Sequence, residues 1–182
     1  LRMKGKGTFV TKQVINRNFI TELYNFTGEM ERQGRKPKTK VLVVEVIHSD
    51  SLIFPLLQVK EGDSVLHFKR LRLADDVPVY VEDSYIDLKQ FPGLEKIDLG
   101  VNSLFHIFEI KYQRPVHTTY NVYTAMLVSD NDSVLLDVEK RSAVHRVQST
   151  TFDALGRCME VSVASFPGER NTYDVIVRRE RK

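Results

Sequence analysis

Cysteine is almost absent from this chain: Cys158 is the only one among 182 residues. A lone cysteine excludes an internal disulfide and is typical of a protein kept in a reducing compartment, so we expect a cytoplasmic location. Catalysis by this thiol would need a histidine partner that the sequence does not identify. We therefore expect Cys158 to act as a small buried hydrophobe.

Long apolar runs are also absent. No stretch approaches the roughly 20 apolar residues of a membrane-spanning helix, and no signal peptide is visible at the start of the chain. We therefore expect no membrane partner. The hydrophobic content of 42% is enough for one real core and a small appendage.

The usual signatures of enzyme chemistry are missing. The five histidines are scattered without metal-type spacing, and no cysteine pair accompanies them. The sequence has no Gly-x-Ser-x-Gly elbow, no dinucleotide fingerprint and no phosphate loop. We therefore expect no metal, no cofactor and no catalytic residue.

Acidic residues are absent from positions 1–18, which hold the basic residues Arg2, Lys4, Lys6, Lys12 and Arg17. Since the formal net charge of the chain is +3, the remainder carries about −2. A nearly neutral body does not offer a nucleic-acid surface, whereas the basic head is a candidate for the edge of one.

Two β-rich runs around an acidic turn, residues 64–86, organise the chain. In the first run Arg70 and Arg72 share a face that begins apolar, because side chains on a strand alternate. In the second run Tyr80 and Glu82 share a face.

The turn sets how the two runs pair. A three-residue loop over positions 75–77 predicts Arg70 opposite Glu82 and Arg72 opposite Tyr80. That register gives a cluster of two cations and one carboxylate beside apolar walls. The alternative is a solvated strand face with a weak surface ion pair.

The other elements predict an α+β fold with a mainly antiparallel β-sheet flanked by helices. We expect a helix within residues 19–34, capped by Thr27 and ended by Gly34, and another from Asn102 or Ser103 to Tyr112. A short helix is expected to begin at Asp50 or Ser51. A strand is expected at 40–48, buried on both faces for part of its length. Further strands are expected at 116–128, 134–144, 147–155, 157–166 and 173–179.

Five segments, in order, resemble the effector-binding (UTRA) domain of GntR-type transcriptional regulators of the HutC subfamily. They span nearly the whole chain, and their order is more specific than any one of them. The segments are KGKGTFV, YNFTGEMERQG, KRLRLADDVPVYVEDSYI, NSLFHIFE and CMEVSVASFPGERNTYDV.

The resemblance implies a chorismate-lyase-like fold, a homodimer, and control of operator binding by a small anionic effector such as a phosphorylated sugar or small acid. It divides the chain into the end of a DNA-binding wing (1–10), a linker (11–18) and the UTRA effector-binding and dimerisation domain (19–182). Lys4, Lys6 and Thr8 belong to the wing, and the resemblance places the rest of the winged helix before this sequence.

The resemblance also implies a ligand site. Arg70 and Arg72 would bind the anion, with Ser103 adding a hydroxyl and helix amides, and Glu82 would accept hydrogen bonds from ligand hydroxyls. The remaining residues would line the pocket or close its far side: Phe26, Thr27, Phe105, Glu160 and Phe166. The family often has tyrosine at positions 105 and 166 and glycine at position 76, so the ligand itself stays open.

Two other functions remain open at this point. One is an enzyme on the same fold, a lyase of a small aromatic acid, since arginine and glutamate in a pocket also suit that chemistry. The other is a dimerisation module that has lost its ligand. The basic head favours the regulator.

Overall fold

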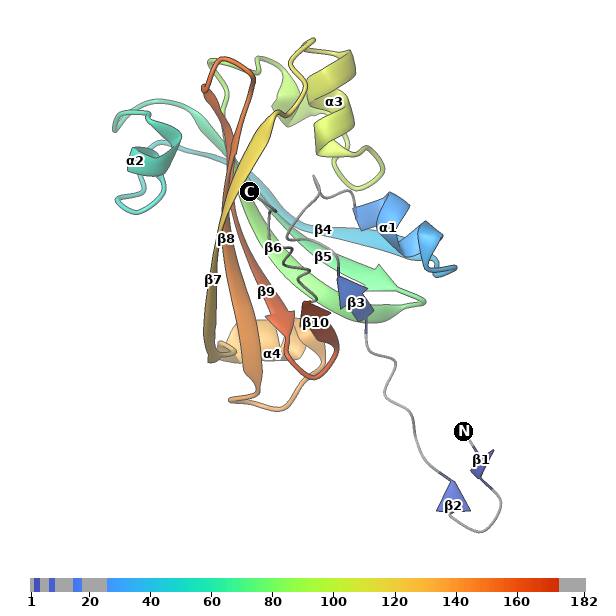
Figure 1. The fold of residues 1–182 in the computed structure, drawn as a ribbon. Coiled ribbons are helices and arrows are strands. Elements are labelled where there is room, and N and C mark those ends of the chain that lie inside the picture. Colours follow the sequence, from blue (N-terminus) through green and yellow to red (C-terminus); the bar gives the residue numbers. More distant parts are fainter. Residues whose placement is uncertain (1, 4–6, 9–14, 18–25, 174–182) are drawn as a thin grey trace, which may run out of the picture.

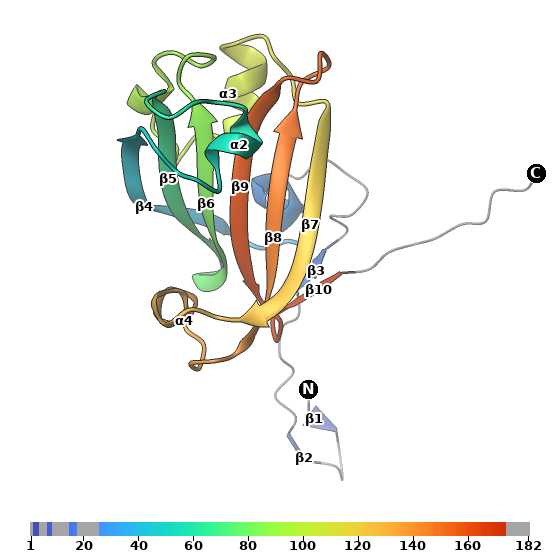
Figure 2. The same cartoon turned by 90° about the vertical axis from the view of Figure 1, so that its left-hand side faces the viewer.

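A six-stranded antiparallel sheet dominates the computed structural model, which describes residues 2–3, 7–8, 15–17 and 26–173. Its strand order is β4-β5-β6-β9-β8-β7, and the sheet curls strongly (Figures 1 and 2). The strands are β4 (Pro37–Ile47), β5 (Val65–Ala74), β6 (Val77–Asp87), β7 (Thr118–Leu127), β8 (Ala143–Phe152) and β9 (Cys158–Pro167). The predicted α+β class with a mainly antiparallel sheet is confirmed.

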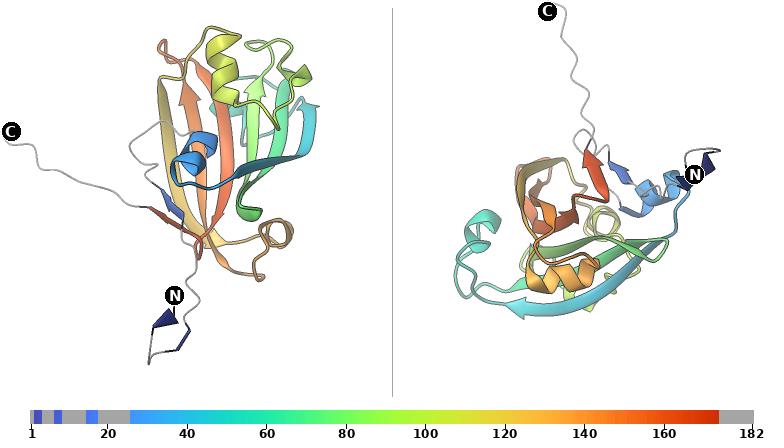
Figure 3. Two further views of the ribbon diagram at one scale, coloured as in Figure 1. Left: turned by 90° about the vertical axis from the view of Figure 1, so that its right-hand side faces the viewer. Right: turned by 90° about the horizontal axis from the view of Figure 1, so that it is seen from below.

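Helices lie on both faces of the sheet. On the inner face are α1 (Phe26–Arg32) and α3 (Leu104–Ile110), and α2 (Phe54–Leu57) lies on the opposite, outer face (Figures 1 and 3). The short η1 (Leu94–Lys96) precedes α3, and α4 (Asp130–Leu136) packs its buried Leu136 with the outer-face residues Leu71 and Val81. The sheet is therefore covered in patches and not along its whole length.

Two small pairings lie outside the main sheet. The segments β1 (Arg2–Met3) and β2 (Gly7–Thr8) form a short antiparallel pair. The segments β3 (Ile15–Arg17) and β10 (Asn171–Tyr173) pair in parallel, so a strand of the predicted linker is joined to the end of the domain.

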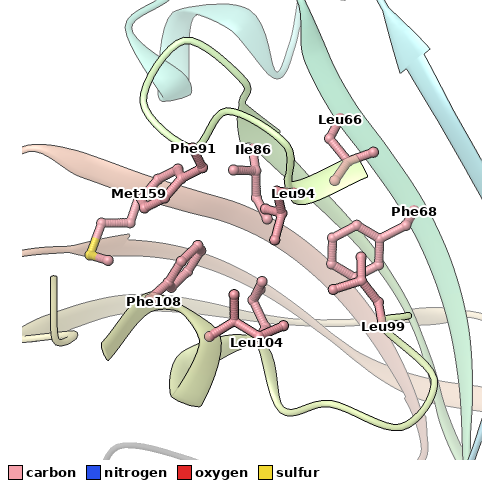
Figure 4. Packing of buried hydrophobic residues seen from close by; sticks show 10 residues of the cluster. Leu66, Phe68, Ile86, Phe91, Leu94, Leu99, Leu104, Phe108 and Met159 are labelled. Atoms are coloured by element: carbon pink, nitrogen blue, oxygen red, sulfur yellow. The ribbon is translucent and has the colours of Figure 1, made fainter. Parts of the chain in front are cut away.

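The core under α3 follows from strand alternation. Leu66, Phe68 and Ile86 point to the inner face and are fully buried against Leu104 and Phe108 of α3 (Figure 4). These residues belong to one cluster of ten buried side chains, which anchors α3 on the sheet. The predicted helix from Ser103 is confirmed, with Ser103 as its extended N-cap residue.

The central hairpin has the predicted register, although its turn differs from the expectation. Arg70 pairs with Glu82 and Arg72 with Tyr80. The loop has two residues, not three, because Asp75 and Asp76 both adopt positive φ (51° and 61°) as a type I′ turn requires. A register shift between Arg72 and Leu73 restores the predicted pairing.

Three other expectations are wrong. Residues 134–144 do not form a strand: α4 occupies 130–136, with the Ser129 hydroxyl accepting from the Asp132 amide at 3.1 Å, and 143–152 is one strand. β4 is an edge strand whose residues are exposed or half-buried, so burial on both faces is excluded. Thr27 lies inside α1 and does not cap it, while Gly34 follows α1 with φ of 70°.

Candidate functional site

A cavity of about 380 Å³ lies on the inner face of the sheet, bordered by α1 and the start of α3. All nine residues expected to contact a ligand line it, although they come from five segments of the chain. They are Phe26, Thr27, Arg70, Arg72, Glu82, Ser103, Phe105, Glu160 and Phe166. The volume is in the range of small-molecule sites.

Two arginines from β5 form a cationic end of this cavity. Arg70 Nη2 donates to Glu82 Oε2 at 2.8 Å, and Arg72 Nη2 lies 3.9 Å from the same oxygen. Arg72 Nη1 also donates to the hydroxyl of Thr39 at 2.7 Å. One carboxylate therefore faces two guanidinium groups, so these three side chains together carry one positive charge.

Several donors of these arginines lack a partner. Arg70 is only 3% exposed, and its Nε and Nη1 atoms, like Nε of Arg72, are buried without a hydrogen bond to any described residue. An unmade hydrogen bond costs about 1–3 kcal/mol per buried group, and more for a charged one. These donor atoms are enclosed by protein atoms, so a ligand would have to shift the arginine side chains to reach them.

Aromatic rings hold the two guanidinium groups in place. The Arg70 guanidinium lies 4.6 Å from the ring centre of Phe68, and that of Arg72 lies 5.4 Å from Phe26. Phe26 in turn packs edge-on against Tyr80 at 5.6 Å between ring centres. Both cations are thus fixed by packing before any ligand binds.

Phe166 and Glu160, both on β9, also line the cavity. Phe166 stacks obliquely on Tyr80 with 4.5 Å between ring centres. Glu160 is 4% exposed and forms no ion pair with the described residues. Burial and the neighbouring charge of Glu82 raise the pKa of Glu160 to about 7, despite an opposing effect of Arg70. Glu160 is therefore a carboxyl group poised between its neutral and charged forms.

The start of α3 adds Ser103 and Phe105 to the lining. The Ser103 side chain makes no capping hydrogen bond, so its hydroxyl is not used by the helix. Phe105 stacks beside Phe108 with 6.4 Å between ring centres. Residue 105 thus lies where the α3 core meets the cavity.

Sequence reasoning missed many of the lining residues, and five of them form one group. All have uncharged polar side chains on neighbouring strands, and we call them the β7–β9 polar face: Thr119, Asn121, Ser149, Thr151 and Ser162. The register pairs Asn121 with Ser149 and Ser149 with Ser162, so they form a row across three strands. Small polar residues spaced two apart at 119 and 121, and at 149 and 151, were the signal that could have identified them.

Of the three residues predicted to belong to a DNA-binding wing, the structure describes only one. Lys4 and Lys6 lie outside the described residues. Thr8 lies in β2, paired with Arg2. Their contact with DNA stays a prediction.

Cys158 is buried, as expected of a structural cysteine. Burial raises the pKa of its thiol to about 11, so it carries no thiolate near neutral pH. Among the described residues no group of three or more histidine, cysteine or carboxylate side chains could hold a metal ion. In the same part of the chain no helix has the length and apolar character to cross a membrane.

Comparison with known proteins identifies the family of this chain. The UTRA domain family matches residues 32–172. NagR, a transcriptional repressor of Bacillus subtilis, is 24% identical over 94% of this chain and 70% of its own length. MngR, the mannosyl-D-glycerate transport and metabolism repressor of Escherichia coli, is 24% identical over 98% of this chain and 73% of its own.

Solved structures share the fold. PhnF from Mycobacterium smegmatis superposes with a TM-score of 0.87 at 18% identity, covering 98% of this chain and 78% of PhnF. A GntR-family regulator from Bacillus cereus gives 0.70 at 20% identity, over 78% of this chain and 99% of its own. Because the sequence relatives are named as transcriptional regulators, the prediction that the chain is not an enzyme is confirmed. The chain belongs to the UTRA domain family, and the resemblance to GntR-type regulators drawn from its motifs is confirmed.

Proposed function

We propose that this domain senses a small anionic metabolite, such as a phosphorylated sugar or a small acid, for a bacterial repressor of the HutC type. The observation that carries the proposal is the pair formed by the buried Arg70 and the half-buried Arg72, which line the cavity and have three nitrogen atoms without a hydrogen bond to the described residues. Guanidinium groups match phosphate or carboxylate oxygens with paired donors. Ser103, which also lines the cavity, adds a hydroxyl that makes no capping hydrogen bond.

Arg70→Ala tests the assignment. We expect the variant to lose at least about 100-fold in affinity for the anion, since each charged hydrogen bond contributes about 1.5–3 kcal/mol. Arg72 remains close to Glu82, so the fold should persist, which circular dichroism can check. Calorimetry with inorganic phosphate and with a panel of sugar phosphates and small carboxylates measures the affinity.

Two controls make this experiment specific. Arg157→Ala removes an arginine that pairs with Asp153 away from the cavity and should leave anion affinity unchanged. Arg70→Lys keeps the charge but loses the planar donor pair, so we expect an intermediate affinity. Equal affinity of Arg70→Ala and the parent protein would refute the site. No thermal shift with any anion would favour a dimerisation module without a ligand.

The linker offers a route from the cavity to operator DNA. β3 lies within the predicted linker and pairs with β10, whose Tyr173 lines the cavity. The ring of Tyr173 contacts Phe166 and His145, with 6.4 Å and 5.0 Å between ring centres. A ligand that favours one position of β10 would bias the linker, and a coupling of about 1–3 kcal/mol is ordinary for such switches.

The DNA-binding and dimeric states belong to the same proposal. We assign residues 1–10 to the end of a wing, 11–18 to the linker and 19–182 to the UTRA domain, with Lys4, Lys6 and Thr8 near operator DNA. A homodimer is supported by the two edge strands, which carry exposed apolar residues such as Val44 on β4 and Tyr120 on β7. Sedimentation of the purified chain tests the dimer.

A further inference from the structure

The β7–β9 polar face has no role in the fold comparable to that of the apolar residues beside it. A buried sheet face normally packs apolar side chains, as Leu66 and Ile86 do under α3. A row of hydroxyl and amide groups in that place would be left without partners if a helix covered it. Here the row lines the cavity, where Thr119, Asn121 and Ser149 are half-buried and so stay accessible to a ligand.

Hydrogen bonds within this face fix its side chains without using all their capacity. The Ser149 hydroxyl donates to Asn121 Oδ1 at 2.7 Å, and the hydroxyls of Thr119 and Thr151 lie 3.3 Å apart. The first bond orients Asn121 so that its amide N–H groups remain available. Two further donors and several hydroxyl lone pairs are thus presented by one rigid surface.

This surface is well separated from the cationic end. Arg70 is on β5 and Ser149 on β8, three strands further along the sheet. Adjacent strands lie about 4.8 Å apart, so their backbones are about 14 Å apart along the sheet. The arginine side chains reach across part of this distance, so a ligand that fills the cavity can contact both the arginines and the polar face.

We propose that the β7–β9 polar face binds an uncharged, hydroxyl-bearing part of the effector, several bonds from the anionic group held by Arg70 and Arg72. This rests on the proposed function and narrows it: the effector is a hydroxylated organic anion. Inorganic phosphate and small aromatic acids lack groups for the second end. Asn121 and Ser149 then determine specificity, whereas the arginines supply affinity for charge.

Two probes of equal length separate these contributions. Sorbitol 6-phosphate and n-hexyl phosphate both carry six carbons and one phosphate, and they differ in the hydroxyl groups. We expect the parent protein to bind sorbitol 6-phosphate, or its cyclic analogue glucose 6-phosphate, at least about tenfold more tightly than hexyl phosphate, because two net hydrogen bonds supply that factor. Calorimetry measures both affinities.

Substitutions then test which residues cause the tighter binding of the hydroxylated probe. Ser149→Ala and Asn121→Ala should each narrow the ratio of the two affinities about fivefold, while Arg70→Ala should weaken both probes together. The control Asn131→Ala alters an exposed asparagine of α4 and should leave the ratio unchanged. Thermal unfolding of each variant confirms that it is folded.

The outcomes are distinct. If hexyl phosphate binds as tightly as the hydroxylated probes, or if the ratio survives both substitutions, the polar face does not read the ligand. If inorganic phosphate alone binds and both six-carbon probes fail, the inference is also overturned, while the anion site stands. If no anion binds at all, the proposed function itself fails.

Discussion

The inner face of the sheet has two halves built on the same strands with opposite character. Where α3 covers it, Leu66, Phe68 and Ile86 are completely buried. Further along the same face, Arg70 follows Phe68 on β5, and Ser84 and then Glu82 follow Ile86 on β6; Arg70 and Glu82 line the cavity. The alternation of side chains is continuous, so it is the covering element that decides whether an inward position holds the fold together or meets a ligand.

Phe108→Ala should destabilise the apolar half of the sheet face, the core under α3. Phe108 is fully buried and packs on Phe91 with 4.4 Å between ring centres. We expect the free energy of unfolding to fall by about 3–5 kcal/mol, because a large cavity replaces the ring. Urea unfolding measures this change. Anion affinity of the protein that remains folded should stay close to that of the parent; its complete loss would mean that the two halves are not separable.

Glu160→Gln should remove a pH dependence of the free energy of unfolding that arises in the cavity half of the sheet. The folded-state pKa of Glu160, about 7, lies above the value near 4.3 of an unfolded chain. The folded state therefore binds the proton more tightly, and this group's contribution to stability is present below pH 4.3 and is lost as pH rises to 7.

The variant should accordingly be more stable than the parent at pH 8, by up to about 3 kcal/mol, and show no such gain at pH 4. Urea unfolding at both pH values measures the difference. The exposed Glu109→Gln serves as the control. His67 on the outer face, whose pKa is raised by its bond to Asp83, adds its own dependence equally to all three proteins. If the free energy of unfolding changed with pH by the same amount in parent and variant, the raised pKa of Glu160 would be contradicted.

Ser149→Ala should have the smallest effect on folding. Its hydroxyl makes one half-buried hydrogen bond, to Asn121, so we expect a loss of about 1 kcal/mol or less. The comparison with Phe108→Ala is the informative part. A loss as large as that of the core variant would assign the polar face to stability and not to recognition.

The hairpin and its register were predictable because local chemistry determines them. Alternation put Arg70 and Arg72 on one face, and the acidic turn limited the pairing to Glu82 and Tyr80. The loop length was wrong because a shift near Arg72 compensates for the shorter turn, and such bulges leave little trace in a sequence.

Tertiary context decided the other cases. Valines suggested that β4 was buried, yet β4 lies at the sheet edge, where few elements cover it. Residues 134–136 have strand-like side chains but continue a helix begun at the Ser129 cap. The β7–β9 polar face escaped notice because strands β7, β8 and β9 are brought together only by the fold. Motif resemblance supplied the nine predicted ligand residues, whose roles as ligand contacts remain predictions.

The most direct test is a crystal structure of the chain grown with phosphate or a sugar phosphate. We predict phosphate oxygens within hydrogen-bond distance of the guanidinium groups of Arg70 and Arg72, which have three nitrogen atoms without a hydrogen bond to the described residues. A phosphate bound elsewhere, with these donors turned to other protein groups, would contradict the account.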